Sequence, residues 1–323
     1  MTALAPADAA AIERAARLLR DGGLVAFPTE TVYGLGADAT SPAAVARIYR
    51  AKGRPSFNPL IAHVADLDAA LAEAALPKAA IRLAETLWPG PLTLVAPRVA
   101  AGSVCDLACA GLASVALRVP EAPVALALIR AAGRPIAAPS ANRSGHVSPV
   151  TAAHVIEDLD GAVDLVLDGG RAERGVESTI LSFVGETPRL LRPGALARET
   201  LEALLGRPLE TTGAAAAVVA PGMTASHYAP RARLRLDASA LREGEAGLDF
   251  AGALRARADA AAMIVDLSPK GDLEEAAANL FGHLRELDAR GADHIAVAPI
   301  PAHGLGEAIA DRLRRAAAPR TKA

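Results

Sequence analysis

The chain has 323 residues, which is enough for two domains and a large hydrophobic core. Apolar residues make up 52% of it, but much of that is alanine, and no apolar run approaches the roughly 20 residues that a membrane-spanning helix needs. A formal net charge of −2 argues against a general attraction to nucleic acid or acidic membranes.

The N-terminal segment and the cysteines bear on the cellular compartment. Residues Met1 to Asp8 contain no basic region followed by an apolar stretch, so we expect no signal peptide and a cytoplasmic location. Cys105 and Cys109 are four residues apart, with no second cysteine pair and no nearby histidine cluster. A metal site built from these two cysteines would be incomplete. We therefore interpret both cysteines as small apolar side chains in a reducing compartment.

Helical and extended patterns alternate from the N-terminus onward. Asp8 can cap an amphipathic helix that runs to Arg20, and an apolar strand at 24–27 is ended by Pro28. The alternation continues with strands expected at 60–64, 92–95, 114–119, 136–138, 165–167 and up to Arg192, and helices at 42–51, 67–75, 77–87, 121–132 and after Thr151. Such interleaving predicts a twisted α/β sheet.

The segment after the first strand concentrates polar groups. Residues 28–36 carry hydroxyls, one carboxylate and two glycines, and we expect them to form a turn. The next helix is expected to start at the N-cap Ser41 and to end at Lys52, with Gly53 as a left-handed C-cap. Because polar and basic groups beyond strand ends are where open α/β sheets bind ligands, we expect the site here.

The pattern breaks between 207 and 233, where Thr, Gly, Ala and Pro dominate, and we interpret this stretch as an interdomain linker. Beyond it the alternation restarts, with strands expected at 263–267 and 294–297 and helices at 272–290 and 306–317. This predicts a second, smaller α/β domain. The Gly-x-Gly at 304–306 lacks the third glycine and the acidic residue of a dinucleotide-binding fingerprint.

The sequence has no phosphate-binding P-loop, no nucleophile elbow and no His-Glu-x-x-His zinc helix. Basic, hydroxyl and amide side chains gather instead near predicted strand ends: Lys52, Arg54, Arg118, Arg192, Thr31, Ser114, Ser140, Ser148, Ser178, Asn58, His63 and Asn142. Four cations beside small hydroxyls suit a polyanion such as a nucleoside triphosphate.

These residues also have structural interpretations. Lys52 and Arg54 follow a helix C-terminus, where cations stabilise the helix dipole. His63 could be a hydrogen-bonded core histidine, and the segment 140–142 could form a turn. Arg118 lies in an otherwise apolar strand, where an unpaired charge is costly, so we expect a partner or a ligand for it. Residue patterns alone therefore predict a phosphate- or nucleotide-using α/β protein.

Six segments in order carry recognisable motifs: 28–35, 52–60, 88–93, 139–142, 175–179 and 191–194. Together they resemble the Sua5/YrdC family of threonylcarbamoyl-AMP synthases, and the segments 221–230 and 304–313 resemble its longer, two-domain Sua5 form. The resemblance implies a YrdC-like catalytic domain at 1–206, with a twisted open mixed sheet and flanking helices. It also implies a linker or lid at 207–233 and a smaller Rossmann-like α/β Sua5 domain at 234–323.

The family's reaction is implied by the same resemblance. L-threonine, bicarbonate or CO2, and ATP give threonylcarbamoyl-AMP and pyrophosphate, with Mg2+ held through the ATP phosphates rather than by side chains. The product serves N6-threonylcarbamoyladenosine at tRNA position 37, through a downstream tRNA threonylcarbamoyl-transferase machinery. No covalent nucleophile is needed, so the enzyme's work is positioning and charge neutralisation.

Site residues follow motif by motif from the resemblance. Lys52, Arg54, Ser140 and Asn142 are implied as catalytic, holding the triphosphate and the metal. The ATP site adds Asn58, Ser114, Ser148, Arg192, His227 and Tyr228. The threonine pocket comprises Thr31, His63, Arg118, Ser178 and the backbone of Ala138, with Arg118 pairing the carboxylate. His227 or Tyr228 folds over the nucleotide as a lid, but Thr224-Ala225-Ser226 are too small for us to expect lid contacts from them.

Two rival functions remain for comparison. A double-stranded RNA-binding protein with this fold would need a broad basic surface, whereas the charge here is balanced. Carbamoyl-phosphate-dependent transfer, as in related maturation enzymes, would bring zinc-finger-like and acylphosphatase-like segments that this sequence does not contain. We expect no membrane partner and no strong direct binding of nucleic acid.

Overall fold

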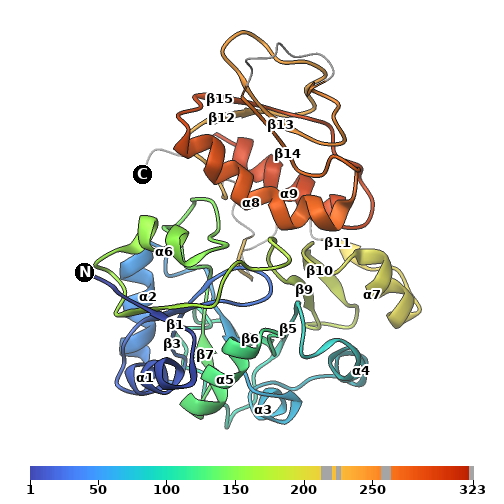
Figure 1. Ribbon diagram of the computed structural model, residues 1–323. Helices are drawn as coiled ribbons and strands as arrows, with labels where there is room; N and C mark the ends of the chain where they lie inside the picture. Colours follow the sequence, from blue (N-terminus) through green and yellow to red (C-terminus); the bar gives the residue numbers. More distant parts are fainter. Residues whose placement is uncertain (212–219, 223–226, 256–262, 320–323) are drawn as a thin grey trace.

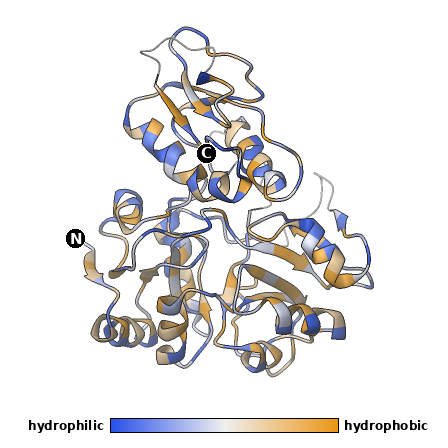
Figure 2. Cartoon of the chain, turned by 45° about the vertical axis from the view of Figure 1, so that its right-hand side comes forward, coloured by the Kyte–Doolittle hydropathy of each residue, from blue (hydrophilic) through white to orange (hydrophobic). Residues whose placement is uncertain are grey.

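The computed structural model describes residues 1–211, 220–222, 227–255 and 263–319. Within these residues the chain forms a large and a small sheet, each with its own helices, and Figure 1 shows the small sheet above the large one, with α8 (Leu273–Ala289) and α9 (Gly306–Ala317) between them. Figure 2 shows hydrophobic residues concentrated in the strands and hydrophilic residues in many of the loops and outer helix faces. None of the described helices is long and apolar enough to cross a membrane.

The large sheet has eleven strands among the described residues, in the order β1-β8-β2-β3-β7-β4-β6-β5-β9-β10-β11. The strands are β1 (Ala3–Pro6), β2 (Val25–Phe27), β3 (Gly34–Asp38), β4 (Ile61–His63), β5 (Leu92–Pro97), β6 (Ser114–Arg118), β7 (Ile136–Ala137), β8 (Leu165–Asp168), β9 (Thr179–Ser182), β10 (Arg189–Arg192) and β11 (Glu210–Thr211). The flanking helices are α1 (Ala9–Arg20), α2 (Pro42–Lys52), α3 (Leu67–Leu71), α4 (Lys78–Leu87), α5 (Pro123–Ala132), α6 (Ala152–Leu159) and α7 (Arg198–Leu205). Parallel and antiparallel pairs mix along the sheet, which confirms the open mixed sheet with flanking helices.

Side chains that alternate along the strands feed two hydrophobic clusters on opposite faces of the large sheet. In β2, Val25 and Phe27 belong to the cluster under α1 and α5, whereas Ala26 belongs to the cluster on the other face. In β8, Leu165 and Val166 divide in the same way. Because both faces are covered, the site can form only at the strand ends and loops.

The caps predicted from the sequence are present. The Asp8 side chain accepts a hydrogen bond from the backbone N–H of Ala11 at the start of α1, and Ser41 does the same for Ala44 at the start of α2. Gly53 ends α2 in the left-handed conformation, with φ of 60°. These caps fix where α2 stops, and so where Lys52 and the loop after it enter the site.

The small sheet is parallel, in the order β12-β15-β13-β14. It comprises β12 (Arg233–Arg235), β13 (Ala246–Asp249), β14 (Ile264–Asp266) and β15 (His294–Val297), with the helices α8 (Leu273–Ala289) and α9 (Gly306–Ala317). Both helices lie on the side that faces the first domain (Figure 1). One hydrophobic cluster joins Val32 and Val176 of the first domain to Leu280 and Phe281 of α8.

Several elements were not predicted. The strand β3 lies within a stretch where only a turn was expected for its first residues, because the sequence Gly-Leu-Gly-Ala-Asp has weak strand propensity. It is held by antiparallel pairing with β2 on one side and β7 on the other. The sequence patterns also gave no strand for β1, β9, β11, β12 or β13 and no helix for α7. The helix expected at 67–75 was too long, since it ends at Leu71.

Part of the segment expected to be a linker pairs with the sheets. Within 207–233, β11 pairs with β10 of the large sheet, and β12 of the small sheet begins at Arg233. The prediction about Thr224-Ala225-Ser226 falls outside the described residues.

Candidate active site

A cavity forms where strand ends of the large sheet meet the chain after residue 220. Its volume is about 40 Å³, space for a few water molecules and far below the roughly 300 Å³ of a small-molecule pocket. Residues from several strand ends line it, together with Pro221, Gly222, His227 and Tyr228. The lining brings together ten of the predicted residues: Thr31, Arg54, His63, Arg118, Ala138, Ser140, Ser178, Arg192, His227 and Tyr228.

Strand register places these residues together. His63 ends β4 and Arg118 ends β6, and the parallel pairing of these strands sets the two residues directly opposite each other. Ala138 follows β7, and its backbone N–H donates to the carbonyl of Ile61 in β4. His63 and Arg118 therefore meet because two parallel strands end at the same edge of the sheet, whereas Ala138 follows the antiparallel β7 and lies beside the start of β4.

Three buried cations surround the cavity. Lys52 Nζ donates to the carbonyls of Ser140, at 2.6 Å, and Asn142. Arg54 donates to the carbonyls of Asn58 and Pro59, and Arg192 donates to those of Ser178 and Pro221. Within the described residues, none of the three cations forms an ion pair with a carboxylate.

Burial without countercharges makes these cations costly. Burial and the neighbouring Arg54 hold the pKa of Lys52 well below 10.5, and burial lowers the pKa of Arg54 to about 10. Carbonyl oxygens satisfy the N–H donors but do not balance the charges. A bound polyanion would supply the missing negative charge and favour the charged forms, so the arrangement favours a phosphate-rich ligand.

Two buried amide oxygens beside these cations lack hydrogen-bond partners in the described part of the chain, those of Asn58 and Asn142. Asn142 is fixed by its Nδ2, which donates to the carbonyls of Arg143 and His146. A buried acceptor without a donor costs free energy, and a ligand or an ion with its hydration shell can satisfy it. Both amides therefore point to a bound group at the cation cluster.

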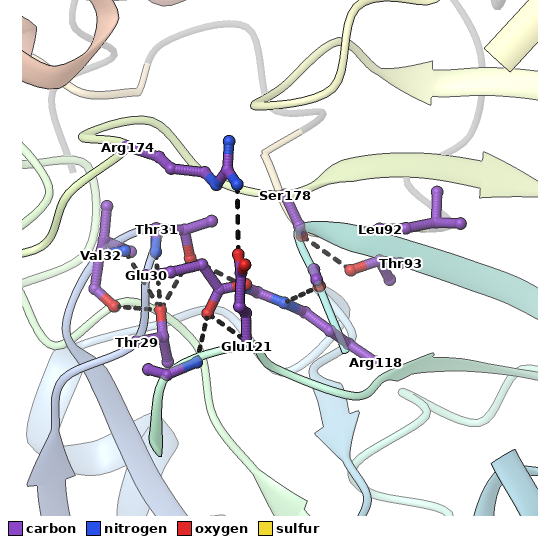
Figure 3. A network of polar contacts seen from close by, with 12 residues as sticks. Thr29, Glu30, Thr31, Val32, Leu92, Thr93, Arg118, Glu121, Arg174 and Ser178 are labelled. Carbon is purple, nitrogen blue, oxygen red and sulfur yellow. Dashed lines mark hydrogen bonds and ion pairs between the residues drawn. The ribbon is translucent and has the colours of Figure 1, made fainter. Parts of the chain in front are cut away.

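On the other side of the cavity, Arg118 is held by a buried ion pair (Figure 3). Its Nη2 lies 2.5 Å from Glu30 Oε1, and its Nη1 donates to Thr31 Oγ1 at 3.0 Å. The other Glu30 oxygen accepts the backbone N–H groups of Glu121 and Ala122. The partner expected for Arg118 is thus Glu30, which orients the guanidinium of this cavity-lining residue.

Ser178 connects the two sides of the site. Its Oγ shares a 2.7 Å hydrogen bond with Thr93 Oγ1 (Figure 3) and accepts another from Arg192 Nη2 at 3.2 Å. The backbone here is packed so closely that a Cβ on Gly194 would lie 2.4 Å from the Glu177 carbonyl. The glycine of the Arg-Pro-Gly motif is therefore required for this close approach.

His63 faces the cavity as a neutral imidazole. Burial, together with the charge of Arg118, lowers its pKa to about 3. Its Nδ1 has no hydrogen-bond partner in the described residues. With that pKa, His63 is too weak a base to take a proton from substrate near neutral pH, and it suits a hydrogen-bonding role.

Replacing His63 by glutamine is expected to change how stability depends on pH. Because the folded-state pKa lies below the unfolded value of 6.5, the unfolded chain binds more protons below pH 6.5. The contribution of His63 to the free energy of unfolding is complete above pH 6.5 and is smaller by about 2 kcal/mol at pH 5. Urea unfolding measured at pH 7 and at pH 5 should therefore show a smaller decrease in the free energy of unfolding for His63→Gln than for the wild type.

The matched control for this measurement is His294→Gln, since His294 is exposed on β15. It should lose as much stability on acidification as the wild type. An equal loss in His63→Gln would contradict the buried neutral state of His63.

His227 and Tyr228 line the cavity beside the buried cations. His227 and Tyr228 are buried, and burial with the charges of Arg54 and Lys52 holds the pKa of His227 well below 6.5. Tyr228 has a φ of 63°, a conformation that L-residues rarely adopt and that concentrates at functional sites. Both side chains therefore occupy a defined position against the cation cluster.

The remaining predicted residues lie outside the lining. Lys52, Asn58 and Asn142 flank it through the contacts given above. Ser148 is fully buried and donates to Glu177 Oε1 at 2.6 Å. Ser114 begins β6, at the opposite end of that strand from Arg118, and is the one predicted residue in the described chain that these contacts do not connect to the cavity.

Sequence patterns missed three acidic or polar groups of the site: Glu30, Glu177 and Thr93. Glu30 and Glu177 lie within motifs, and an acidic residue between hydroxyls was a signal for the partner of a buried arginine. Thr93 gave no such signal, because alternation in β5 identifies its face only once the partner strand is known.

Comparison with known proteins gives a consistent result. A family model for Sua5, YciO and YrdC proteins, described as "Telomere recombination", matches residues 17–194, and a model of the threonylcarbamoyl-AMP synthase C-terminal domain matches 196–318. Threonylcarbamoyl-AMP synthases of Bacillus subtilis and Pyrococcus abyssi are each 42% identical, over 95% and 94% of this chain and 92% and 93% of their own. The crystal structure of P. abyssi Sua5 complexed with L-threonine is 39% identical, with a TM-score of 0.88 over 98% of this chain and 97% of that chain.

Proposed function

The chain belongs to the Sua5, YciO and YrdC family, and from this premise we propose how its site performs the reaction of the family's synthases. It is a threonylcarbamoyl-AMP synthase, a nucleotidyltransferase that uses ATP and L-threonine. Neither the relatives nor the described contacts support the double-stranded RNA-binding alternative.

The observation that carries the mechanism is the set of three buried cations without carboxylate partners. We assign Lys52, Arg54 and Arg192 to the triphosphate of ATP, since they can neutralise charge that shifts toward the leaving pyrophosphate. The amino acid lies on the other side of the cavity, with its carboxylate on Arg118 and its amine toward His63 and Thr31.

Bicarbonate or CO2 is the third substrate in this proposal. The threonine amine adds to the carbon of CO2 to give a carbamate, so that a C–N bond forms as one C=O π bond opens onto oxygen, and the amine proton passes to water. When bicarbonate is the source, it first loses hydroxide to give CO2. A carbamate oxygen then attacks the α-phosphorus, and the bond to the bridging oxygen of pyrophosphate breaks. The protein forms no covalent intermediate, so rate acceleration comes from alignment and from the cations.

Mg2+ fits the site as the metal that accompanies ATP. Within the described residues no three His, Cys, Asp or Glu side chains could hold a metal ion. The unpartnered Asn142 oxygen and the Ser140 hydroxyl are the kind of oxygen donors that complement phosphate-bound Mg2+. Bound in this way, Mg2+ would offset phosphate charge, while the protein cations orient the nucleotide.

Further parts of the proposal concern the chain's organisation and surroundings. We assign catalysis to residues 1–206, a lid to 207–233 through His227 and Tyr228, and a supporting domain to 234–323. Because the cavity is smaller than its substrates, we expect His227 and Tyr228 to shift when ATP and threonine bind. The adenylate would pass to cytoplasmic machinery that transfers threonylcarbamoyl to tRNA.

Pyrophosphate release tests this function. Purified protein with ATP and Mg2+ should release pyrophosphate only when L-threonine and bicarbonate are both present. L-serine, which lacks the threonine methyl group, is the matched control substrate and should react more slowly. Release that requires neither amino acid nor bicarbonate would contradict the proposal.

A further inference from the structure

The largest fully buried side chain among the described residues belongs to Arg312 in α9 of the C-terminal domain. Its Nε donates to Glu177 Oε2 at 2.8 Å, and its Nη1 donates to Asp311 Oδ2 at 2.7 Å. Glu177 belongs to the first domain and lines the cavity. A buried ion pair therefore crosses the domain boundary and ends at the active site.

Glu177 is held on both of its carboxylate oxygens. Oε2 accepts from Arg312, and Oε1 accepts from the hydroxyl of Ser148 at 2.6 Å. Its backbone carbonyl accepts the N–H of Ala195, beyond the Arg-Pro-Gly motif. The next residue is Ser178, whose carbonyl accepts two hydrogen bonds from Arg192. Movement of the Glu177 carboxylate would therefore disturb Ser178 and Arg192, on the two sides of the cavity.

The same guanidinium supports the lid. The guanidinium carbon of Arg312, Cζ, lies 5.1 Å from the centroid of the Tyr228 ring, which is within cation–π range. Phe281 of α8 also packs on Tyr228, and the centroids of the two stacked rings are 5.5 Å apart. Arg312 thus contacts one residue of the cavity floor and one residue of the lid.

The electrostatics are consistent with a fully charged pair. Burial alone would raise the pKa of Glu177, but Arg312 and Arg192 hold it below 4.5. Burial would lower the pKa of Arg312, but Tyr228, Glu177 and Asp311 hold it above its usual value. The buried imidazole of His227 also faces these groups, since the charges of Arg312 and Arg192 add to burial, Arg54 and Lys52 in lowering its pKa. Arg312 Nη2 has no hydrogen-bond partner in the described residues, so Nε and Nη1 carry the polar contacts of the guanidinium.

Packing alone does not require an arginine at this position. The domain boundary already carries an apolar cluster, including Val176 and Phe281. It also has a backbone contact so close that a Cβ on Gly175 would lie 2.4 Å from the Ala277 carbonyl of α8. Buried ion pairs add little net stability compared with well-packed apolar side chains. The ion pair is better explained by the geometry that it imposes on Glu177 and Tyr228.

We propose that Arg312 is a positioning residue for threonylcarbamoyl-AMP synthesis, through which the C-terminal domain fixes the Glu177–Ser178 segment and the lid residue Tyr228. The inference rests on the proposed function. Arg312 does not touch the reacting atoms. It acts by holding Glu177 ionised and in place and by supporting the Tyr228 ring. The C-terminal domain is then part of the working site rather than an attached module.

The test compares Arg312→Gln, Arg312→Lys, Glu177→Gln and the double variant Arg312→Gln/Glu177→Gln with the wild type. Arg314→Gln is the matched control, because Arg314 is exposed on the same helix. We expect Arg312→Gln to lower kcat/KM about 100-fold, since small displacements of positioning groups cost this much. Arg312→Lys retains the charge and should recover at least about tenfold of that loss.

The pH profile separates positioning from packing. Without Arg312, burial raises the pKa of Glu177, and the acid limb of kcat/KM should move to higher pH than in the wild type. The limb should be absent in the double variant, which has no Glu177 carboxylate. Expressing each rate relative to the wild type at the same pH and CO2 pressure removes the titration of substrates.

Thermal unfolding identifies the folded variants that can be compared. If Arg312→Gln does not fold, Arg312→Lys and the double variant, which leaves no buried charge unpaired, still give the comparison. Folded variants within about twofold of wild-type kcat/KM would overturn the inference. An activity loss that is independent of pH and not recovered by lysine would also overturn it in favour of packing. An inactive wild type would instead contradict the proposed function.

Discussion

Replacing Arg54 by alanine should lower the rate of threonylcarbamoyl-AMP formation by about 10³-fold. Removing a group that stabilises charge in the transition state has an effect of this size. Arg54 is buried beside the cavity and donates only to backbone carbonyls in the described part of the chain. The fold should survive, because the lost contacts are those of a buried cation without a countercharge. Steady-state pyrophosphate release, measured at saturating threonine, checks the result.

Two further variants serve as controls for this prediction. Arg50→Ala removes an exposed arginine from α2, four residues before Arg54, and should retain wild-type activity. Arg54→Lys keeps the charge but loses the fork of N–H donors, so it should fall between the wild type and Arg54→Ala. Wild-type turnover in folded Arg54→Ala would remove Arg54 from the triphosphate site.

Arg118→Ala should raise the KM for threonine about 100-fold and that for ATP much less. A buried charged hydrogen bond to the carboxylate accounts for an effect of this size. The variant should also lose about 3–5 kcal/mol of stability, because Glu30 would remain buried without its partner. Initial rates over a grid of both substrate concentrations separate the two KM values, and urea unfolding gives the stability.

The double variant Arg118→Gln/Glu30→Gln controls for the stability loss, since it leaves no unpaired charge. It should unfold less readily than Arg118→Ala yet keep the high KM for threonine. Arg174→Ala, which removes an exposed arginine from the network in Figure 3, should change neither quantity. Equal effects of Arg118→Ala on both substrates would contradict the assignment of Arg118 to threonine.

The parts of the fold predicted from the sequence are those specified locally. The caps Asp8, Ser41 and Gly53 and the apolar strands at 24–27 and 92–95 each follow from a few adjacent residues. Strands such as β3 and β13 contain glycine and lack β-branched residues, so they exist because neighbouring strands pair with them. No local pattern records that pairing.

The site residues also fall into those that the sequence indicated and those that only the fold revealed. Motif resemblance predicted Lys52 and Arg54, and the structure places both against the cavity or its flank. Arg118 in an apolar strand correctly indicated a need for a partner, but the partner, Glu30, emerged only from the fold. Arg312 was not predicted as a site residue, because its environment depends on Glu177, 135 positions away.

Mass spectrometry of the nucleotide product formed from 13C-labelled bicarbonate distinguishes activation of a carbamate from activation of threonine itself. We expect an adenylate that contains threonine and is one mass unit heavier than the product from unlabelled bicarbonate. We also expect Arg54→Ala to form almost none of this species. An adenylate of threonine that carries no label from bicarbonate would show that the amino acid itself is activated, and would contradict synthesis through a carbamate.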